Sequence, residues 1–106
     1  MRKLFARQGE ILIFKVEKKR KITEEVREFV LRKGEVTGHK HLLVADRPET
    51  KLRIAKDKNG YYIEIEGGTA TITHEEHKPI TLNPGFYFVG VQREYDPERY
   101  RREVKD

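Results

Sequence analysis

The chain has 106 residues, which is the size of one ordinary domain with a single modest hydrophobic core. It carries 36% hydrophobic and 39% charged residues, a net charge of +5 and no cysteine, so disulfides, thiolate metal sites and a cysteine nucleophile are excluded. The N-terminal residues lack the apolar stretch of a signal peptide, and no apolar run reaches the ~20 residues of a membrane helix, so we expect a cytoplasmic protein without a membrane partner.

Short apolar runs separated by turn residues follow one another along the whole chain and predict strands. The first run is apolar on both faces, as in a central strand, and the second follows Thr23 to Glu25, which could alternatively cap a short helical turn. The segments with a strand pattern are 11–16, 27–32, 39–45, the run around 52–54, 61–66, 69–74, 80–82 and 86 to about 94.

Glycine and proline turns connect these runs. The Asn59-Gly60 pair is a strong hairpin signal, because both residue types accept positive φ. The tail after Asp96-Pro97 could form a helical turn or a last strand. About eight short strands, no repeat and no linker predict one all-β domain over residues 1–106. We expect an antiparallel β-sandwich or barrel, cupin-like (jelly-roll) in outline, with little helix.

All four histidines fall into two close pairs, His39-x-His41 and His74-x-x-His77. Side chains two residues apart in a strand point to the same side, so His39 and His41 share a face. His74 shares a face with the apolar Ile72, which places it at the inward end of its strand.

Two imidazoles at this spacing can converge on one ion, and two such pairs on neighbouring strands would give a site with three or four ligands. Glu75, Glu76 or Glu94 could add a carboxylate. The imidazole-rich set suits zinc or iron, whereas manganese would need more carboxylates. The predicted ligands are His39, His41, His74 and His77. Alternatively, these histidines cap backbone groups or lie on the surface, or His39 and His41 serve proton transfer or phosphate contact without a metal.

The leading hypothesis is therefore a small metal-binding β-protein of unknown reaction. Whether it is an enzyme stays open, because the chain has no nucleophile motif and no phosphate-binding glycine loop. The last predicted strand ends with polar residues that could hydrogen-bond to the metal ligands without binding the metal themselves, namely Gln92, Arg93 and Glu94. The alternative for Glu94 is a simple ion pair with an arginine. Gln92 and Glu94 share a face with Phe86 and Phe88, which we expect to be the core face.

The alternative function is that of a basic nucleic-acid-binding accessory protein. The positive charge is locally concentrated, and exposed tyrosines could stack on bases. The basic residues concerned are Lys18, Lys19, Arg20 and Lys21. However, scarce Asn, Gln and Met beside abundant Glu, Lys and Arg are typical of high-temperature organisms, whose surfaces are charged for other reasons. A third possibility is a structural or interaction module, such as a phage component, and homo-oligomerisation is left open.

Two stretches resemble the cupin superfamily. Gly34 followed by His39-x-His41 resembles the first cupin motif, and residues 68–85 are similar to the glycine, two strands and Pro-Gly turn that precede the second motif. The resemblance covers about half of the chain and implies a jelly-roll fold with a metal at the histidines.

The chain departs from the cupin pattern in two places. Residues 45–46 are Ala-Asp where a glutamate is expected, and residues 89–94 contain no histidine where one is expected. In a cupin-like metal site, His74 or His77 would have to substitute for the missing histidine.

The chain also resembles, over its whole length, a set of small uncharacterised prokaryotic and phage proteins. This resemblance implies no known activity. It rests on the motifs Arg7-Gln8-Gly9, Gly34-Glu-Val-Thr-Gly-His39-x-His41, His74-Glu-Glu-His77 and Gln92-Arg-Glu-Tyr95-x-Pro97.

Overall fold

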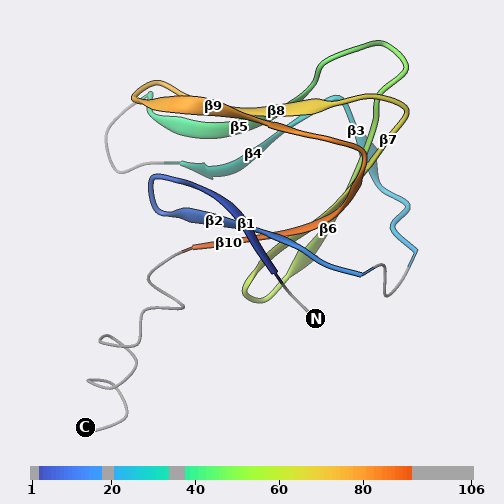
Figure 1. Cartoon of the computed structure of the whole chain (residues 1–106), viewed down its shortest axis with the longest axis horizontal. Coiled ribbons are helices and arrows are strands. Elements are labelled where there is room, and N and C mark those ends of the chain that lie inside the picture. Colours follow the sequence, from blue (N-terminus) through green and yellow to red (C-terminus); the bar gives the residue numbers. More distant parts are fainter. Residues whose placement is uncertain (1–2, 18–20, 34–37, 92–106) are drawn as a thin grey trace, which may run out of the picture.

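Two antiparallel sheets pack against each other in the computed structural model, which describes residues 3–17, 21–33 and 38–91 (Figure 1). The larger sheet contains, in spatial order, β1 (Lys3–Gln8), β2 (Ile11–Lys15), β10 (Gly85–Val91), β7 (Gly60–Glu66), β6 (Lys51–Asp57) and β3 (Glu25–Val26). The smaller sheet contains β4 (Glu28–Lys33), β5 (Lys40–Ala45), β8 (Ala70–His74) and β9 (His77–Leu82). The predicted all-β antiparallel sandwich is confirmed.

Four hairpins stay within one sheet, namely β1–β2, β4–β5, β6–β7 and β8–β9. The strand β10 lies between β2 and β7, so the end of the described chain joins the first hairpin to the third. The finer expectation of a cupin-like outline stays a prediction.

The core lies between the sheets and consists of aliphatic side chains that alternate with outward residues along each strand. Most inward positions on the central strands are almost completely buried, whereas Ala45 and Tyr61 are partly buried at the edge of the core. The largest contributors are Ile11, Ile13, Leu43, Leu52, Ile63, Ile65, Ile72, Leu82 and Tyr87. Because alternation with a period of two fixes which side chains point inward, this pattern explains why the sequence forms strands of this register.

The first strand was not predicted. Residues Lys3–Gln8 form β1 at an edge of the larger sheet, with a register shift between Leu4 and Ala6, and Gly9 and Glu10 form the turn that leads into β2. The helical turn considered near residue 24 is wrong, because β3 begins at Glu25. The described residues contain no helix that is long and apolar enough to cross a membrane.

The assignment of the core face in the last strand was also wrong. Tyr87 and Val89 belong to the core cluster, whereas Phe88 lies on the opposite face of the sheet. There its ring is 6.5 Å from that of Phe14 and 4.9 Å from that of Tyr62, measured between centroids. Both faces of β10 are therefore apolar, and alternation alone could not tell them apart.

The predicted hairpin at residues 57–60 is present, and Gly60 has the expected positive φ, whereas Asn59 does not. Lys58 and Asn59 form the turn, and no residue other than glycine has a positive φ among those described. A Cβ atom on Gly60 would lie 2.0 Å from the carbonyl oxygen of Val89 on β10. Gly60 is needed because the two backbones approach each other closely here.

Gly60→Ala should lower the free energy of unfolding by about 1–3 kcal/mol or more, because the added methyl group must displace the backbone of β10. Lys58→Ala, in the exposed turn beside it, is the matched control and should change the stability by less than ~0.5 kcal/mol. Urea unfolding of both variants measures the effect. A Gly60→Ala variant as stable as the control would contradict this view of the hairpin.

Candidate functional site

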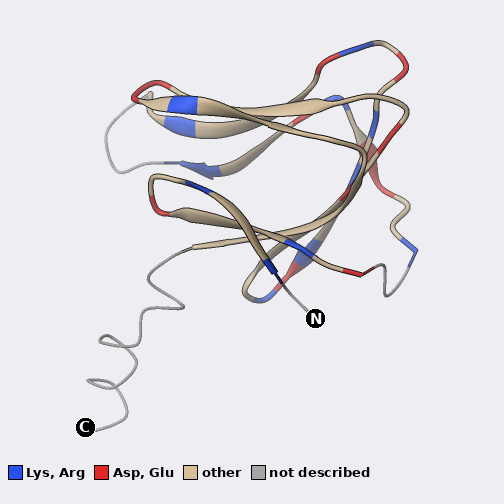
Figure 2. Ribbon diagram, in the orientation of Figure 1, with Lys and Arg blue, Asp and Glu red and all other residues tan. Residues whose placement is uncertain are grey.

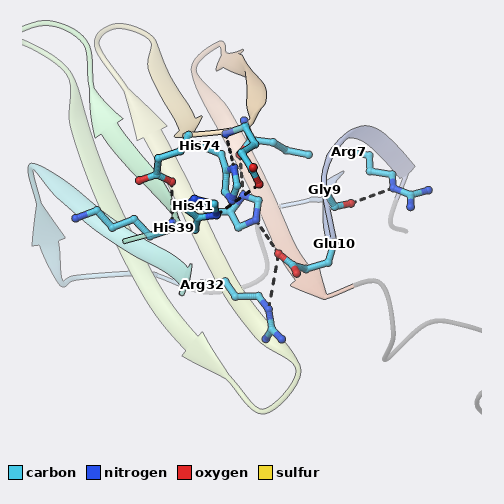
Figure 3. Close-up of polar contacts among 11 residues, drawn as sticks. Arg7, Gly9, Glu10, Arg32, His39, His41 and His74 are labelled. Atoms are coloured by element: carbon cyan, nitrogen blue, oxygen red, sulfur yellow. Dashed lines mark hydrogen bonds and ion pairs between the residues drawn. The ribbon is translucent and has the colours of Figure 1, made fainter. Parts of the chain in front are cut away.

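The four histidines come together at one end of the smaller sheet (Figure 3). The ring centroids of His41 and His74 are 4.3 Å apart, and those of His74 and His77 are 4.7 Å apart. The ring centroid of His39 is 5.8 Å from that of His74, and the ring centroid of His77 is 6.3 Å from that of His41. We call these four residues the histidine cluster.

Strand pairing explains this proximity. His41 lies on β5 next to β8, and it points inward like Leu43 two residues later. His74 ends β8 and His77 begins β9, and the two are directly paired across the turn of residues 75–76. A register shift after Ile72 accompanies this turn. Two pairs far apart in sequence therefore meet at the same sheet end.

The first hairpin closes the cluster from the other sheet. The ring of His41 is completely buried, and its two nitrogens each meet an oxygen at 2.8 Å. Nδ1 faces the side-chain oxygen of Gln8, at the end of β1, and Nε2 faces a carboxylate oxygen of Glu10 in the β1–β2 turn. The Glu10 side chain is 46% exposed, so this side of the cluster reaches solvent.

Hydrogen bonding fixes which nitrogen of His41 carries a proton. The side-chain amide nitrogen of Gln8 donates to the carbonyl oxygens of Ile72 (3.0 Å) and Lys78 (2.8 Å), so both of its N–H groups are used and its oxygen must accept. His41 therefore donates from Nδ1 to Gln8. A proton lies between Nε2 and Glu10 only when the imidazole is charged or the carboxyl group is protonated.

Both members of this pair have altered acidity. Burial lowers the pKa of His41, although the hydrogen bond that protonated His41 donates to the Glu10 carboxylate opposes this shift. The hydrogen bond with His41 lowers the pKa of Glu10, against a smaller opposing effect of burial. The positive charge of Arg32, whose Nε lies 4.0 Å from the Glu10 carboxylate, lowers the pKa of Glu10 further.

The other histidines are held by the turn between β8 and β9. Nδ1 of His74 accepts the backbone N–H of Glu76 at 3.0 Å, so the proton of neutral His74 is on Nε2. Nδ1 of His39 lies 3.5 Å from the Glu76 carboxylate. The carboxylate of Glu75 accepts the backbone N–H of Lys40 at 2.9 Å, which ties this turn to β5.

Gly9 makes room for the cluster. Its φ is +57°, in the region that favours glycine, and a Cβ atom there would lie 2.7 Å from Nε2 of His77 and 3.4 Å from Cε1 of His41. The first turn therefore packs its bare backbone against two of the imidazole rings.

As the side chains lie, no group of three or more His, Asp or Glu residues in the described ranges is placed to hold a metal ion. Nε2 of His41 faces Glu10, and Nδ1 of His74 is occupied by a backbone N–H. The donor atoms have the chemistry of a metal site, but a metal would require some imidazoles to turn.

The remaining predicted site residues are partly outside the described structure. Gln92, Arg93, Glu94 and the basic residues 18–20 lie outside it. Lys21 borders a cavity of about 380 Å³ that is also lined by Arg53, Glu64 and Glu66, so its described surroundings are of mixed charge. Figure 2 likewise shows Lys and Arg interspersed with Asp and Glu along the described chain.

Three residues at the site were missed from the sequence, namely Gln8, Glu10 and Arg32. Gln8 was part of the shared motif Arg7-Gln8-Gly9, which was the one available signal. Arg32 and His41 are paired across β4 and β5, a contact that requires the strand register to be known.

A family model described as a domain of unknown function (DUF8820) matches residues 7–92. The chain belongs to this family. The matched range begins just before Gln8 and includes Glu10, Arg32 and the histidine cluster. The search of curated proteins and the search of solved structures each find no match. Membership agrees with the expected small family without a known activity, and the cupin resemblance stays a prediction.

Acid should destabilise the metal-free protein. The pKa values of His41 and Glu10 in the folded state lie below their usual values of 6.5 and 4.5, so the unfolded chain binds more protons as the pH falls. The stabilisation from both groups is present above pH about 6.5 and is lost as the pH falls through their folded pKa values. Calorimetry with a chelator should show the melting temperature falling from pH about 6.5 to about 4.

Glu10→Gln should change the shape of this profile. The loss below pH about 4.5 should shrink, and the loss due to His41 should grow, because the hydrogen bond that raises the pKa of His41 is weakened. The exposed Glu49→Gln is the control and should reproduce the original profile. A melting temperature that does not change over this pH range would refute the assignment.

Proposed function

We propose that this protein binds a divalent transition-metal ion at the histidine cluster, with His41 and Glu10 as its first two ligands. The observation that supports this most strongly is the contact of 2.8 Å between Nε2 of the buried His41 and the Glu10 carboxylate. A nitrogen and a carboxylate oxygen are the ligand types available to a chain without cysteine.

The contact requires a cation whenever His41 is neutral. Gln8 holds the proton on Nδ1, so neutral His41 directs the lone pair of Nε2 at an oxygen that also carries negative charge. Only a proton between the two atoms, or a metal ion that both of them bind, would make this arrangement favourable. Because burial lowers the pKa of His41, the proton leaves more readily than from an exposed histidine, which favours the metal.

Gln8 has the role that an orienting partner has in many metal sites. A metal-bound histidine usually donates its other N–H to a fixed acceptor, which sets the ring orientation. Here the acceptor is the Gln8 oxygen, and Gln8 itself is held by two backbone carbonyl groups. This part of the site is already organised before a metal binds.

The other ligands would come from the cluster by side-chain rotation. His77 is exposed and lies beside Gly9, so it can turn at little cost. His39 is 26% exposed and can also rotate, whereas His74 would first have to release the backbone N–H of Glu76. The proposed set is thus His41, Glu10 and His77, with His39 and His74 as further candidates.

Zinc and iron fit this donor set better than manganese, since imidazole outnumbers carboxylate. A bound ion with an open coordination position would supply Lewis-acid activation of water or of a carbonyl group. The glutamate expected from the cupin pattern is absent after His41, and we propose that Glu10 takes its place as the carboxylate ligand.

The untagged protein should bind about one zinc or iron ion per chain, and its melting temperature should rise when the metal is added. Glu10→Gln and His77→Ala should each weaken binding by at least about tenfold, because each removes a proposed ligand. Both side chains reach solvent, so the substitutions should be tolerated. Metal analysis and calorimetric titration measure these effects.

Glu49→Gln serves as the matched control for charge and should bind metal like the wild type. No stoichiometric metal, together with no rise in melting temperature with Zn²⁺, Fe²⁺ or Mn²⁺, would rule out the proposed function.

Gln8→Met should weaken metal binding by about 10- to 100-fold, because His41 loses the partner that orients it. The substitution also removes two hydrogen bonds to backbone carbonyls and will lower stability. Thr50→Val separates the two effects, since Thr50 is equally buried and donates to the Thr69 carbonyl away from the cluster. Equal metal affinities in these two variants would argue against an orienting role of Gln8.

A further inference from the structure

Arg32 has an unmet hydrogen-bonding group at the edge of the site. Its Nε is buried and, within the described part of the chain, has no hydrogen-bond partner. A carboxylate oxygen of Glu10 lies 4.0 Å from this nitrogen, which is close enough for charge attraction and too far for a hydrogen bond. Figure 3 shows Arg32 and the histidine cluster on opposite sides of the Glu10 carboxylate.

His41 and Arg32 share the carboxylate of Glu10. Its oxygen is already hydrogen-bonded to His41 at 2.8 Å, and Arg32 approaches the same oxygen. Two other carboxylates lie beside the histidine cluster and have their own partners. Glu75 accepts a backbone N–H of β5, and Glu76 lies near His39. The Nε–H of Arg32 is therefore left without a hydrogen-bond acceptor among the described residues, while the Glu10 carboxylate beside it is engaged by His41.

We infer that Arg32 binds the oxyanion group, a carboxylate or a phosphate, of a small ligand beside the histidine cluster. This inference rests on the proposed metal site, since an ion bound to Glu10 would neutralise the one carboxylate that approaches the guanidinium. The metal and Arg32 would then present two positive centres to one anion. The guanidinium has a planar set of five donors that matches the geometry of carboxylates and phosphates.

The position of Arg32 suits this role. It is fixed on β4 directly opposite His41 on β5, so it is held by the sheet and not by a loop. Its side chain is 29% exposed and that of Glu10 is 46% exposed, so a ligand can reach both from solvent. A water molecule between Arg32 and Glu10 is the simpler occupant, and the experiment distinguishes it from an anion.

Calorimetric titration of the zinc-loaded protein, with free zinc removed, uses inorganic phosphate and acetate as probes. The comparison between the two probes identifies which oxyanion is preferred. Arg32→Gln should weaken binding of the preferred probe by about 10- to 100-fold, the range expected for a lost charge-assisted hydrogen bond. Arg32→Lys should give an intermediate loss, because the charge remains and the planar fork does not.

Lys33→Gln removes the same charge from the next, exposed position of β4 and should leave the affinity unchanged. Melting curves of all variants confirm that each is folded. If neither probe binds to the wild type, or if Arg32→Gln binds as tightly as the wild type, the inference is wrong.

The two proposals fail separately. If the protein binds zinc but neither phosphate nor acetate, the proposed role of Arg32 is wrong and the proposed metal site stands. If zinc does not bind, the metal site is wrong, and the same comparison of wild type with Arg32→Gln in the metal-free protein decides whether Arg32 holds an anion.

Discussion

The side-chain amide of Gln8 is the contact on which the site depends. It lies at the end of β1 in the larger sheet and donates to the carbonyl groups of Ile72 and Lys78 in the smaller one. Its oxygen accepts from His41. One almost fully buried side chain therefore joins its own strand, β1, to three strands of the smaller sheet, β5, β8 and β9. A buried amide that meets all of its partners is worth more than its separate bonds, because leaving any of them unpaired is costly.

The site lies where the apolar core ends. Along β5 the inward positions change from Leu43 to His41, and along β8 they change from Ile72 to His74. The same strand geometry that packs aliphatic side chains in the middle of the sandwich thus carries imidazoles at its end. The buried imidazole of His41 is tolerated there because Gln8 and Glu10, from the hairpin of the opposite sheet, supply hydrogen-bond partners. Fold and site are consequences of one alternating pattern.

The sequence was sufficient for most of the strands and for the grouping of the histidines, and insufficient for the contacts that surround the histidines. Alternation predicts the inward position of His41, because it depends only on neighbours in the same strand. The contacts of His41 with Gln8 and Glu10 bridge residues more than thirty positions apart, and no local pattern encodes them. β1 was missed because most of its side chains are exposed, and the wrong face of β10 was chosen because Phe88 is as buried as Val89.

The register shift in β1 affects how easily two copies of this protein can associate through their sheet edges. β1 is an edge strand of the larger sheet, and it exposes the apolar side chains of Leu4 and Phe5. An edge strand with exposed apolar side chains can pair with a strand of a second chain. The shift between Leu4 and Ala6 interrupts the regular spacing of backbone groups at that point. A regular strand from another molecule could form hydrogen bonds with β1 on only one side of this shift. The shift therefore disfavours aggregation through β1, the edge strand whose last residue, Gln8, contacts the histidine cluster.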